Sequence, residues 1–353
     1  MHMLLVFFQH LLYNTVIANG KELPDMVTIK DIAQEAGVST MMVSRVINKR
    51  YNQVSAENIE RIEKIIEKHN YIPNSAAQSL SSKASKIIAI FIQGDANSLE
   101  HPYNAVMLGY LIQNIQARGY DTMVHFISNY SDVCNKLQSW KASGAVFFGM
   151  FEKDFIQFQS NEKIPFVFTD CYSSSMSIAN VGIDNYKGGS LAAQHLLEYG
   201  HTNFAVVGEY FNESILIQQR LKGFCDTLNK AGMEIEQDHI INFDSATAEK
   251  LIEIQQKHLA IFAFSDILSL KIIKQLSEHG YHVPHDFSII GFDNLFICHL
   301  TSPELTTISQ SLSDKAESAV NLLFQYLEYP NMPLQNIILD VELIIRDTVK
   351  KII

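Results

Sequence analysis

The stretch from Thr28 to Asn48, TIKDIAQEAGVSTMMVSRVIN, decides the fold of the first domain. Its first part carries one apolar stripe at helical spacing, made of Ile29, Ile32, Ala33 and Ala36. Gly37 allows a sharp turn, and Ser39 is a suitable N-cap for a second helix that we expect to end near Asn48. Helix, tight turn and helix in this order predict a helix-turn-helix unit.

A third helix completes this unit. We expect Ser55 to cap it and its inner face to consist of Ile59, Ile62, Ile65 and Ile66. Charge favours contact with DNA, because Met26–Lys86 holds nine Lys and Arg against six Asp and Glu, whereas Ile87–Ile353 holds seventeen against thirty. The net charge is −11, so the positive balance is confined to the helix-turn-helix region.

From Ile87 onward, short apolar strands alternate with helices. The expected buried strands are Ile87–Ile92, Ala145–Phe148, Phe166–Phe168, Phe204–Val207, Ala260–Phe264 and Ser288–Ile290, and a further strand is expected near Thr122–Ile127. A first helix is expected at about 103–118, and later helices end at Gly200, Gly232 and Gly280. This alternation predicts doubly wound parallel sheets in two lobes, with a ligand cleft between the lobes at the carboxyl ends of the strands.

Composition argues against several other classes of protein. The 4 Cys residues show no CxxC spacing, so neither a disulfide framework nor a zinc site is expected. GxSxG, P-loop and HExxH motifs are absent, and we expect no enzyme activity, cofactor or metal. Residues 1–25 hold an apolar run too short to span a membrane. We expect either that translation starts at Met26 or that residues 1–25 are a poorly ordered extension.

Ordered motifs extend over nearly the whole chain. Those of the head are Thr28–Ala33, Ala36–Ser39, Val43–Asn48, Val54-Ser55 and Tyr71–Asn74. Those further on are Val181–Asn185, Gly188-Gly189, His195-Leu196, Gly200-His201, Arg220–Gly223, Gly291–Asn294 and Leu305–Ile308. Together they resemble the lactose/galactose repressor family of bacterial transcriptional regulators.

The resemblance implies a multi-domain protein. It places an all-α helix-turn-helix DNA-binding head at residues 26–72 and a hinge helix with its linker at residues 73–86. A two-lobed α/β sensor, similar to periplasmic sugar-binding proteins and responsible for effector binding and dimerisation, follows at residues 87–353.

The same resemblance assigns residues that contact DNA. In the head they are Thr28, Ser39, Thr40, Met41, Ser44, Arg45, Asn48, Gln53, Ser55, Asn58 and Tyr71. Base edges would be read from the start of the second helix, and Asn48, Gln53, Ser55 and Asn58 would contact phosphates. Met41-Met42 departs from the family's usual polar pair. Methionine can pack on thymine methyl groups, and Met42 either does so or fills the small core.

In the hinge, the resemblance assigns DNA contacts to Asn74, Ala77, Gln78 and Leu80. Small residues at Ala76 and Ala77 would let two hinge helices approach each other closely. Leu80 would either enter the minor groove between base pairs or serve as an ordinary linker leucine.

The effector contacts implied by the resemblance are Tyr103, Asp170, Arg220, Phe243, Ser265 and Asp293. Their chemistry suits a polyhydroxylated ligand, because Arg220 offers a planar fork of donors, the carboxylates accept from hydroxyls and Phe243 offers a stacking face. Alternatively, Arg220 pairs with a surface carboxylate and Asp293 caps a turn. Ser265 stands where the family more often has asparagine, and Asp266 is expected to cap the following helix.

These features predict a cytoplasmic, homodimeric repressor that binds double-stranded operator DNA. A small effector, with a sugar favoured, would control this binding, and we expect no association with membranes. Glu342–Thr348 lies just past the last expected core strand, without a leucine heptad, which favours a dimer over a tetramer. One alternative is an exported sugar-binding protein of a transporter, which leaves the helix-turn-helix unexplained. Another is a regulator that answers to a protein partner.

Overall fold

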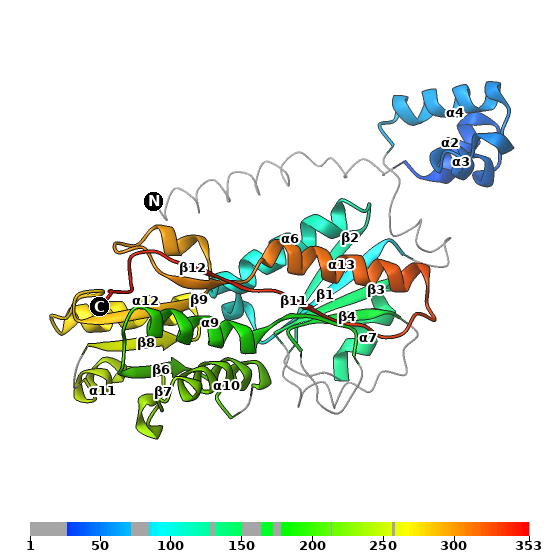
Figure 1. Cartoon of the computed structure of the whole chain (residues 1–353). Coiled ribbons are helices and arrows are strands. Elements are labelled where there is room, and N and C mark those ends of the chain that lie inside the picture. Colours follow the sequence, from blue (N-terminus) through cyan, green and yellow to red (C-terminus); the bar gives the residue numbers. More distant parts are fainter. Residues whose placement is uncertain are drawn as a thin grey trace, which may run out of the picture. The chain divides into compact units, whose positions relative to one another are not determined.

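The computed structural model of the chain describes residues 27–71, 85–127, 131–149, 164–171, 178–212, 214–255 and 258–352. Two compact units divide between Lys83 and Ala84. Figure 1 shows the first as a group of helices in blue and the second as a larger α/β body. No helix of the described residues is long and apolar enough to cross a membrane.

The head is a three-helix unit that also contains one short 3-10 helix. Its elements are α2 (Ile29–Ala36), α3 (Thr40–Ile47), η1 (Tyr51–Gln53) and α4 (Ala56–Lys68). Thr28 and Asp31 form a capping box at the start of α2, and Gly37 ends this helix with a φ of 63°, which glycine adopts without strain. The side chain of Ser39 caps α3 by accepting from the Met42 amide at 3.3 Å. Ser55 stands at the N-cap of α4, but its side chain makes no capping hydrogen bond.

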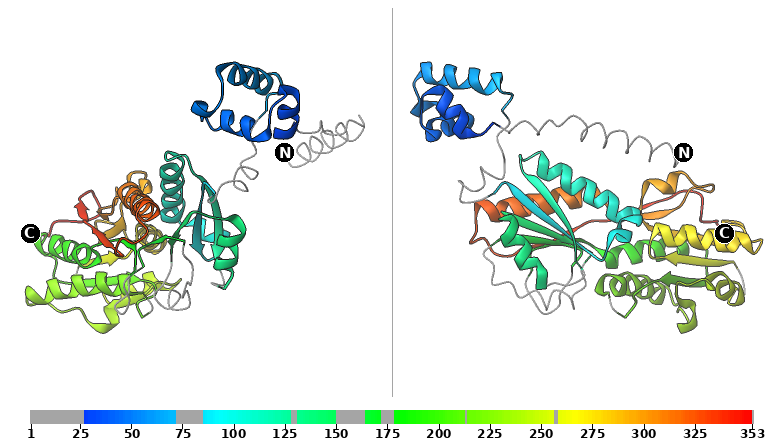
Figure 2. Two further views of the ribbon diagram at one scale, coloured as in Figure 1. Left: turned by 90° about the vertical axis from the view of Figure 1, so that its right-hand side faces the viewer. Right: turned by 180° about the vertical axis from the view of Figure 1, so that it is seen from behind.

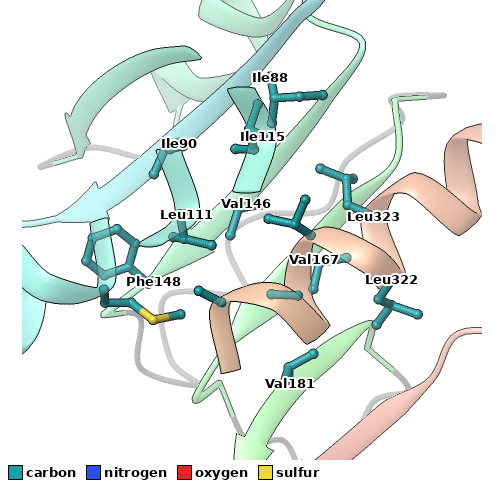
Figure 3. Packing of buried hydrophobic residues seen from close by; sticks show 14 of the residues in the cluster. Ile88, Ile90, Leu111, Ile115, Val146, Phe148, Val167, Val181, Leu322 and Leu323 are labelled. Atoms are coloured by element: carbon teal, nitrogen blue, oxygen red, sulfur yellow. The ribbon is translucent and has the colours of Figure 1, made fainter. Parts of the chain in front are cut away.

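The N-lobe of the second unit is a six-stranded parallel sheet with the order β11-β5-β4-β3-β1-β2. Its strands are β1 (Ile87–Gln93), β2 (Asp121–Ile127), β3 (Gly144–Phe148), β4 (Phe166–Thr169), β5 (Asn180–Ile183) and β11 (Asn336–Leu339). Its helical elements are η2 (Ala96–Glu100), α6 (Pro102–Gln116), α7 (Ser131–Trp140) and α13 (Leu312–Glu328). Apolar side chains of α6 and α13 pack on one face of the sheet, where Leu111, Ile115, Leu322 and Leu323 meet Ile88, Val146 and Val167 (Figure 3).

The C-lobe has a second six-stranded sheet, with the order β12-β10-β9-β8-β6-β7. Its strands are β6 (Phe204–Gly208), β7 (Ile240–Asn242), β8 (Leu259–Ala263), β9 (Phe287–Asp293), β10 (Thr307–Ser309) and β12 (Glu342–Ile344). Its helical elements are α9 (Asn185–Glu198), α10 (Ile215–Lys230), η3 (Gln237–His239), α11 (Thr247–Glu253), α12 (Asp266–Glu278) and η4 (Phe296–His299). Helices cover both faces of this sheet, which agrees with the doubly wound arrangement predicted from the sequence (Figure 2).

The chain crosses between the lobes three times. It leaves the N-lobe after β5 at Asp184, returns from β10 through Gln310 into α13, and leaves again between β11 and β12. As a result, the last part of the chain completes both sheets.

The expected strands are all present, with bounds that differ by one to three residues. At the chain end the structure has a strand that the sequence did not predict. Glu342–Ile344 forms β12, a partly exposed strand that pairs antiparallel with β10 at the edge of an otherwise parallel sheet. Its partner lies more than thirty residues earlier in the chain, so no local pattern marks it.

Candidate effector cavity and DNA-reading helix

A cavity of about 250 Å³ lies between the two lobes. The N-lobe supplies His101, Tyr103, Phe148, Gly149, Thr169 and Asp170 to its lining. The C-lobe supplies Glu209, Tyr210, Leu216, Ile217, Arg220, Phe264, Ser265, Leu268 and Asp293, and Gln310 lines it from a crossover. Gly149, Asp170, Glu209 and Phe264 directly follow strands β3, β4, β6 and β8, and Asp293 ends β9, which is where ligands bind in open α/β sheets.

Five of the six residues expected to contact an effector line this cavity: Tyr103, Asp170, Arg220, Ser265 and Asp293. The sixth, Phe243, does not. It follows β7 and packs, partly buried, against the core of the C-lobe, with Lys271 Nζ 5.4 Å from its ring centroid. Phe264, Tyr210 and Phe148 provide the aromatic faces of the cavity instead.

Arg220 is held in place from three sides. Its Nε donates to Asn185 Oδ1 at 2.8 Å and its Nη1 to the Phe264 carbonyl at 2.7 Å. The ring of Phe292 lies beneath the guanidinium, with the ring centroid 3.5 Å from Cζ. The side chain is therefore a buried cation in the cavity wall.

On the N-lobe side, Asp170 follows β4 and receives two hydrogen bonds at the same oxygen. Tyr103 Oη donates to Asp170 Oδ2 at 2.5 Å, and Lys315 Nζ donates to it at 2.6 Å. Lys315, in the first turn of α13, is completely buried. Burial lowers the pKa of Lys315, whereas the adjacent Asp170 raises it and favours the ammonium form.

Asp293 ends β9 on the C-lobe side and is 5 % exposed. Its Oδ1 accepts from Gln310 Nε2 at 2.5 Å. Burial, and then the nearby carboxylate of Asp266, raise the pKa of Asp293 to about 8, while the charge of Arg220 opposes this shift. The carboxyl group therefore titrates near neutral pH.

The backbone is unusual at the same positions. Asp170, Asp293 and Asn294 have φ values of 55°, 120° and 56°, in a region that residues other than glycine seldom adopt. Such strain persists only where surrounding contacts fix the chain, and it concentrates at functional sites. Here it turns the two carboxylates out of their strand ends and into the cavity wall.

The prediction that Asp266 caps α12 was wrong. Ser265 is the N-cap, and its Oγ accepts from the Leu268 amide at 3.2 Å. The buried Asp266 carboxylate instead accepts from the Leu295 amide at 2.7 Å and from Thr307 Oγ1 at 2.5 Å. Both partners lie far along the chain, so a local capping argument could not find them.

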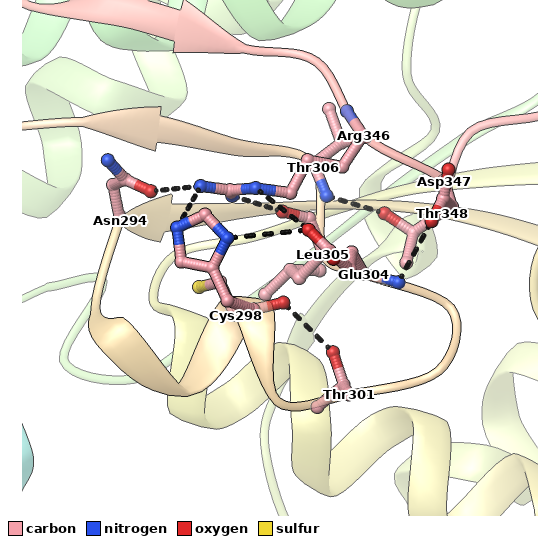
Figure 4. Close-up of polar contacts among 10 residues, drawn as sticks. Asn294, Cys298, Thr301, Glu304, Leu305, Thr306, Arg346, Asp347 and Thr348 are labelled. Atoms are coloured by element: carbon pink, nitrogen blue, oxygen red, sulfur yellow. Dashed lines mark hydrogen bonds and ion pairs between the residues drawn. The ribbon is translucent and has the colours of Figure 1, made fainter.

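A second polar cluster supports the loop that follows Asp293. Arg346 Nη2 donates to Asn294 Oδ1 and Nη1 to the Leu305 carbonyl, both at 2.6 Å. Figure 4 shows this guanidinium between Asn294 and the Leu305–Thr306 backbone. The segment after β12 thereby holds the cavity-facing end of β9 in place.

Sequence reasoning missed several polar residues at the cavity. The lining residues it missed are His101, Thr169, Glu209, Tyr210 and Gln310, and behind the lining it missed Lys315 and Asn185. The available signal was the position of Lys315 within an apolar helical stripe formed by Leu312, Ala316, Ala319 and Val320. A lysine on such a face is seldom fully buried unless a partner neutralises it.

In the head, the start of α3 is exposed. Met41 is 63 % exposed, whereas Met42 is partly buried and packs against the head core, which favours the structural role for Met42. Thr28, Ser39, Thr40, Asn48 and Ser55 are also exposed, and Ser44, Arg45, Asn58 and Tyr71 are partly exposed. Asn48 Nδ2 donates to the Ser44 carbonyl at 2.7 Å. The hinge positions Asn74, Ala77, Gln78 and Leu80 lie outside the described residues.

A helix-turn-helix head with an exposed second helix, joined to a two-lobed unit with a polar cavity, defines a DNA-binding regulator with a ligand-binding sensor. Residues 28–74 match the lacI family of bacterial regulatory proteins, and residues 193–349 match the periplasmic binding protein-like domain. The chain is 30% identical over 343 residues to the HTH-type transcriptional repressor PurR of Actinobacillus pleuropneumoniae serotype 3 (strain JL03). The match covers 93% of this chain and 99% of that protein.

Two solved structures share the fold. The lac repressor dimer bound to operator and the anti-inducer ONPF has a TM-score of 0.78 at 24% identity, covering 92% of this chain and 99% of the other. The transcriptional regulator CelR in complex with cellobiose has a TM-score of 0.69 at 23% identity, with 91% and 99% covered. The chain belongs to the lacI family of DNA-binding transcriptional repressors, as its motifs predicted, and its relatives are regulators and not enzymes.

Proposed function

We propose that this repressor senses a neutral, sugar-like effector in the cavity between its lobes and that the bound effector changes its affinity for operator DNA. The observation that carries this proposal is that Arg220, Asp170 and Asp293 line one small cavity together with aromatic faces. A forked donor, carboxyl oxygens that accept and a ring face are the groups that recognise adjacent hydroxyls on a sugar ring.

The size of the cavity favours a small ligand. Its volume of about 250 Å³ lies just below the range of about 300–1,000 Å³ found for typical ligand sites. This favours a single sugar ring over an extended ligand. The cellobiose that is bound to the relative CelR adds support for a carbohydrate.

The experiment combines a binding screen with a DNA-binding assay. Neutral monosaccharides are first screened by thermal shift, where a ligand at 100 times its dissociation constant adds about 2.7 kcal/mol of stability. Operator affinity is then measured with and without the sugar that binds. A sugar that stabilises the protein and changes operator affinity supports the proposal, and a panel without any thermal shift contradicts it.

We further propose that the protein acts in the cytoplasm as a homodimer on a pseudo-palindromic operator. One recognition helix per chain requires two chains to read two half-sites. Two large apolar side chains of the C-lobe, Phe296 and Leu300, are 75% and 68% exposed, and a second subunit would cover them. Binding that neutralises phosphates releases counterions, so operator affinity should fall steeply with salt.

A further inference from the structure

Lys315 is 0 % exposed and lies on the apolar face of α13 beside Leu312 and Ala316. Placing an ammonium group in the protein interior is strongly unfavourable unless charge and hydrogen bonds compensate. Lys315 does not line the cavity, so contact with a ligand does not explain this residue. The contacts that Lys315 makes within the protein explain its burial.

The ammonium group has three donors and three acceptors around it. Nζ lies 2.6 Å from Asp170 Oδ2, 2.5 Å from Gln310 Oε1 and 3.1 Å from Tyr103 Oη. An ammonium can only donate, so each of these three atoms must accept. The ion pair with Asp170 balances its charge.

This requirement fixes how the neighbouring groups are oriented. Because Tyr103 Oη accepts from Lys315, its own proton is directed to Asp170 Oδ2, 2.5 Å away. Because Gln310 turns Oε1 to Lys315, its amide Nε2 faces Asp293 Oδ1, also 2.5 Å away. Tyr103 and Asp170 belong to the N-lobe wall and Asp293 to the C-lobe wall. One ammonium therefore sets the direction of hydrogen bonds on both walls.

We propose that Lys315 is the positioning residue of the effector cavity: without touching the ligand, it links the two walls through Gln310 and fixes which of their groups donate and which accept. This inference rests on the proposed function for its ligand-binding consequence, but the link itself exists without any ligand. A ligand is then met by wall groups whose orientation is already set, which reduces the ordering cost of binding.

The first test requires no ligand. Tyr103 and Asp293 are joined through Lys315 and Gln310, so their effects on stability should be coupled. Tyr103→Phe, Asp293→Ala and the double variant are unfolded with urea in the full chain. We expect the double-mutant cycle to deviate from additivity by at least about threefold in the unfolding equilibrium constant. In the Lys315→Met background this deviation should disappear.

Additive effects in the presence of Lys315, or coupling that survives in Lys315→Met, would overturn the link. If Lys315→Met does not fold, the pair variant Asp170→Asn/Lys315→Met replaces it. That variant removes both charges, leaves no unpaired ion and should show the same loss of coupling.

The second test uses D-ribose, D-glucose and D-galactose as probes. For the sugar that binds, Lys315→Met should raise the dissociation constant at least about tenfold, since the wall groups lose their fixed orientation. The control Lys222→Met removes an exposed lysine paired with Asp226 and should leave the dissociation constant unchanged. An unchanged constant in Lys315→Met overturns the positioning role. Failure of all three sugars to bind contradicts the proposed effector class, while the ligand-free cycle still decides whether the link exists.

Discussion

The guanidinium of Arg220 lies over the ring of Phe292, with Cζ 3.5 Å from the ring centroid. Arg220 comes from α10, and Phe292 comes from β9, one residue before Asp293. The stacking thus places Arg220, the cation of the C-lobe wall, against β9, the strand that ends at Asp293. A lysine would keep the charge but lose the planar fork and most of the stacking.

Arg220→Lys should therefore lose the effector response and keep operator binding. We expect an increase of roughly tenfold or more in the dissociation constant of the sugar found in the screen, because each lost hydrogen bond costs about 1–3 kcal/mol. The measurement is sugar affinity by calorimetry and operator affinity by gel shift. Arg118→Lys, a change in the N-lobe at a residue that does not line the cavity, is the control. A normal response in Arg220→Lys would remove this residue from the site.

Asp293 should make stability fall as pH rises from about 4 to about 8. Its folded-state pKa of about 8 lies above its ordinary 3.8, so between these pH values the folded state binds more protons than the unfolded state. The contribution is complete at low pH and is lost as pH rises through about 8. The groups around this carboxyl are Asp266, Arg220, Gln310 and Lys315.

The comparison of wild type with Asp293→Asn in urea, at pH 6 and pH 9, isolates this contribution. We expect the wild type to lose at least about 1 kcal/mol more than the variant between these two pH values. Asp238→Asn, at an exposed position, should behave as wild type. Parallel curves for wild type and Asp293→Asn would show that the carboxyl is ionised throughout.

His201 should make stability fall at acidic pH. It is buried, its Nε2 lies 2.9 Å from the Lys350 carbonyl oxygen, and its Nδ1 has no hydrogen-bond partner among the described residues. Burial, followed by the nearby His258, lowers the pKa of His201 to about 4. Stability is then complete above the unfolded value of 6.5 and is lost as pH falls towards 4.

His201→Gln keeps a donor for the Lys350 carbonyl oxygen and cannot titrate. Between pH 7.5 and pH 5, we expect the wild type to lose roughly 2 kcal/mol more than this variant, measured by urea unfolding. His279→Gln, at an exposed site, is the control. Equal acid sensitivity of wild type and His201→Gln would refute this assignment.

Met41 should read thymine in the operator. Its side chain is 63% exposed in the first turn of α3 and can pack on a C5-methyl group. Replacing thymine by uracil removes only that methyl, and at one symmetric pair of positions this should weaken binding about threefold to tenfold. Met41→Ala should bind both DNAs equally, whereas Met123→Ala, in the sensor, should retain the difference. Equal sensitivity to uracil in the wild type and in Met41→Ala would exclude this contact.

Phe296 and Leu300 should hold two subunits together. Both belong to η4 or its C-cap, and replacing them removes exposed apolar surface without disturbing the core. Phe296→Ser/Leu300→Ser should shift a dimer to a monomer in light scattering, whereas Tyr329→Ser, an exposed N-lobe residue, should not. A double variant that remains dimeric would place the interface elsewhere.

The sequence predicted correctly those helices, turns and strands that depend on residues close together in the chain. The stripe of α2, the Gly37 turn and the Ser39 cap depend on neighbours within a few residues, and the long apolar runs of β1 and β9 mark strands buried on both faces. The short strands β7 and β10 offer only three residues each, too few to show a pattern.

The polar wall of the cavity escaped prediction for another reason. Lys315 binds Asp170 and Tyr103, which precede it by 145 and 212 residues. Asp266 likewise binds Thr307, 41 residues away, so its role as a buried acceptor was mistaken for a cap. The resemblance to relatives placed five lining residues correctly in one cavity, but it could not indicate Lys315, which matches no motif quoted from the sequence.

The three crossovers have a consequence for synthesis on the ribosome. The N-lobe core includes Ala316, Ala319, Val320 and Leu323 of α13, and its sheet is completed by β11 at residues 336–339. Nascent chains fold from the N-terminus as complete units emerge. The head can fold once its own three helices have left the exit tunnel, but neither lobe can close its sheet until β11 and β12, at residues 336–344, have also emerged. During that interval the nascent polypeptide carries a DNA-reading head without an assembled sensor to control it.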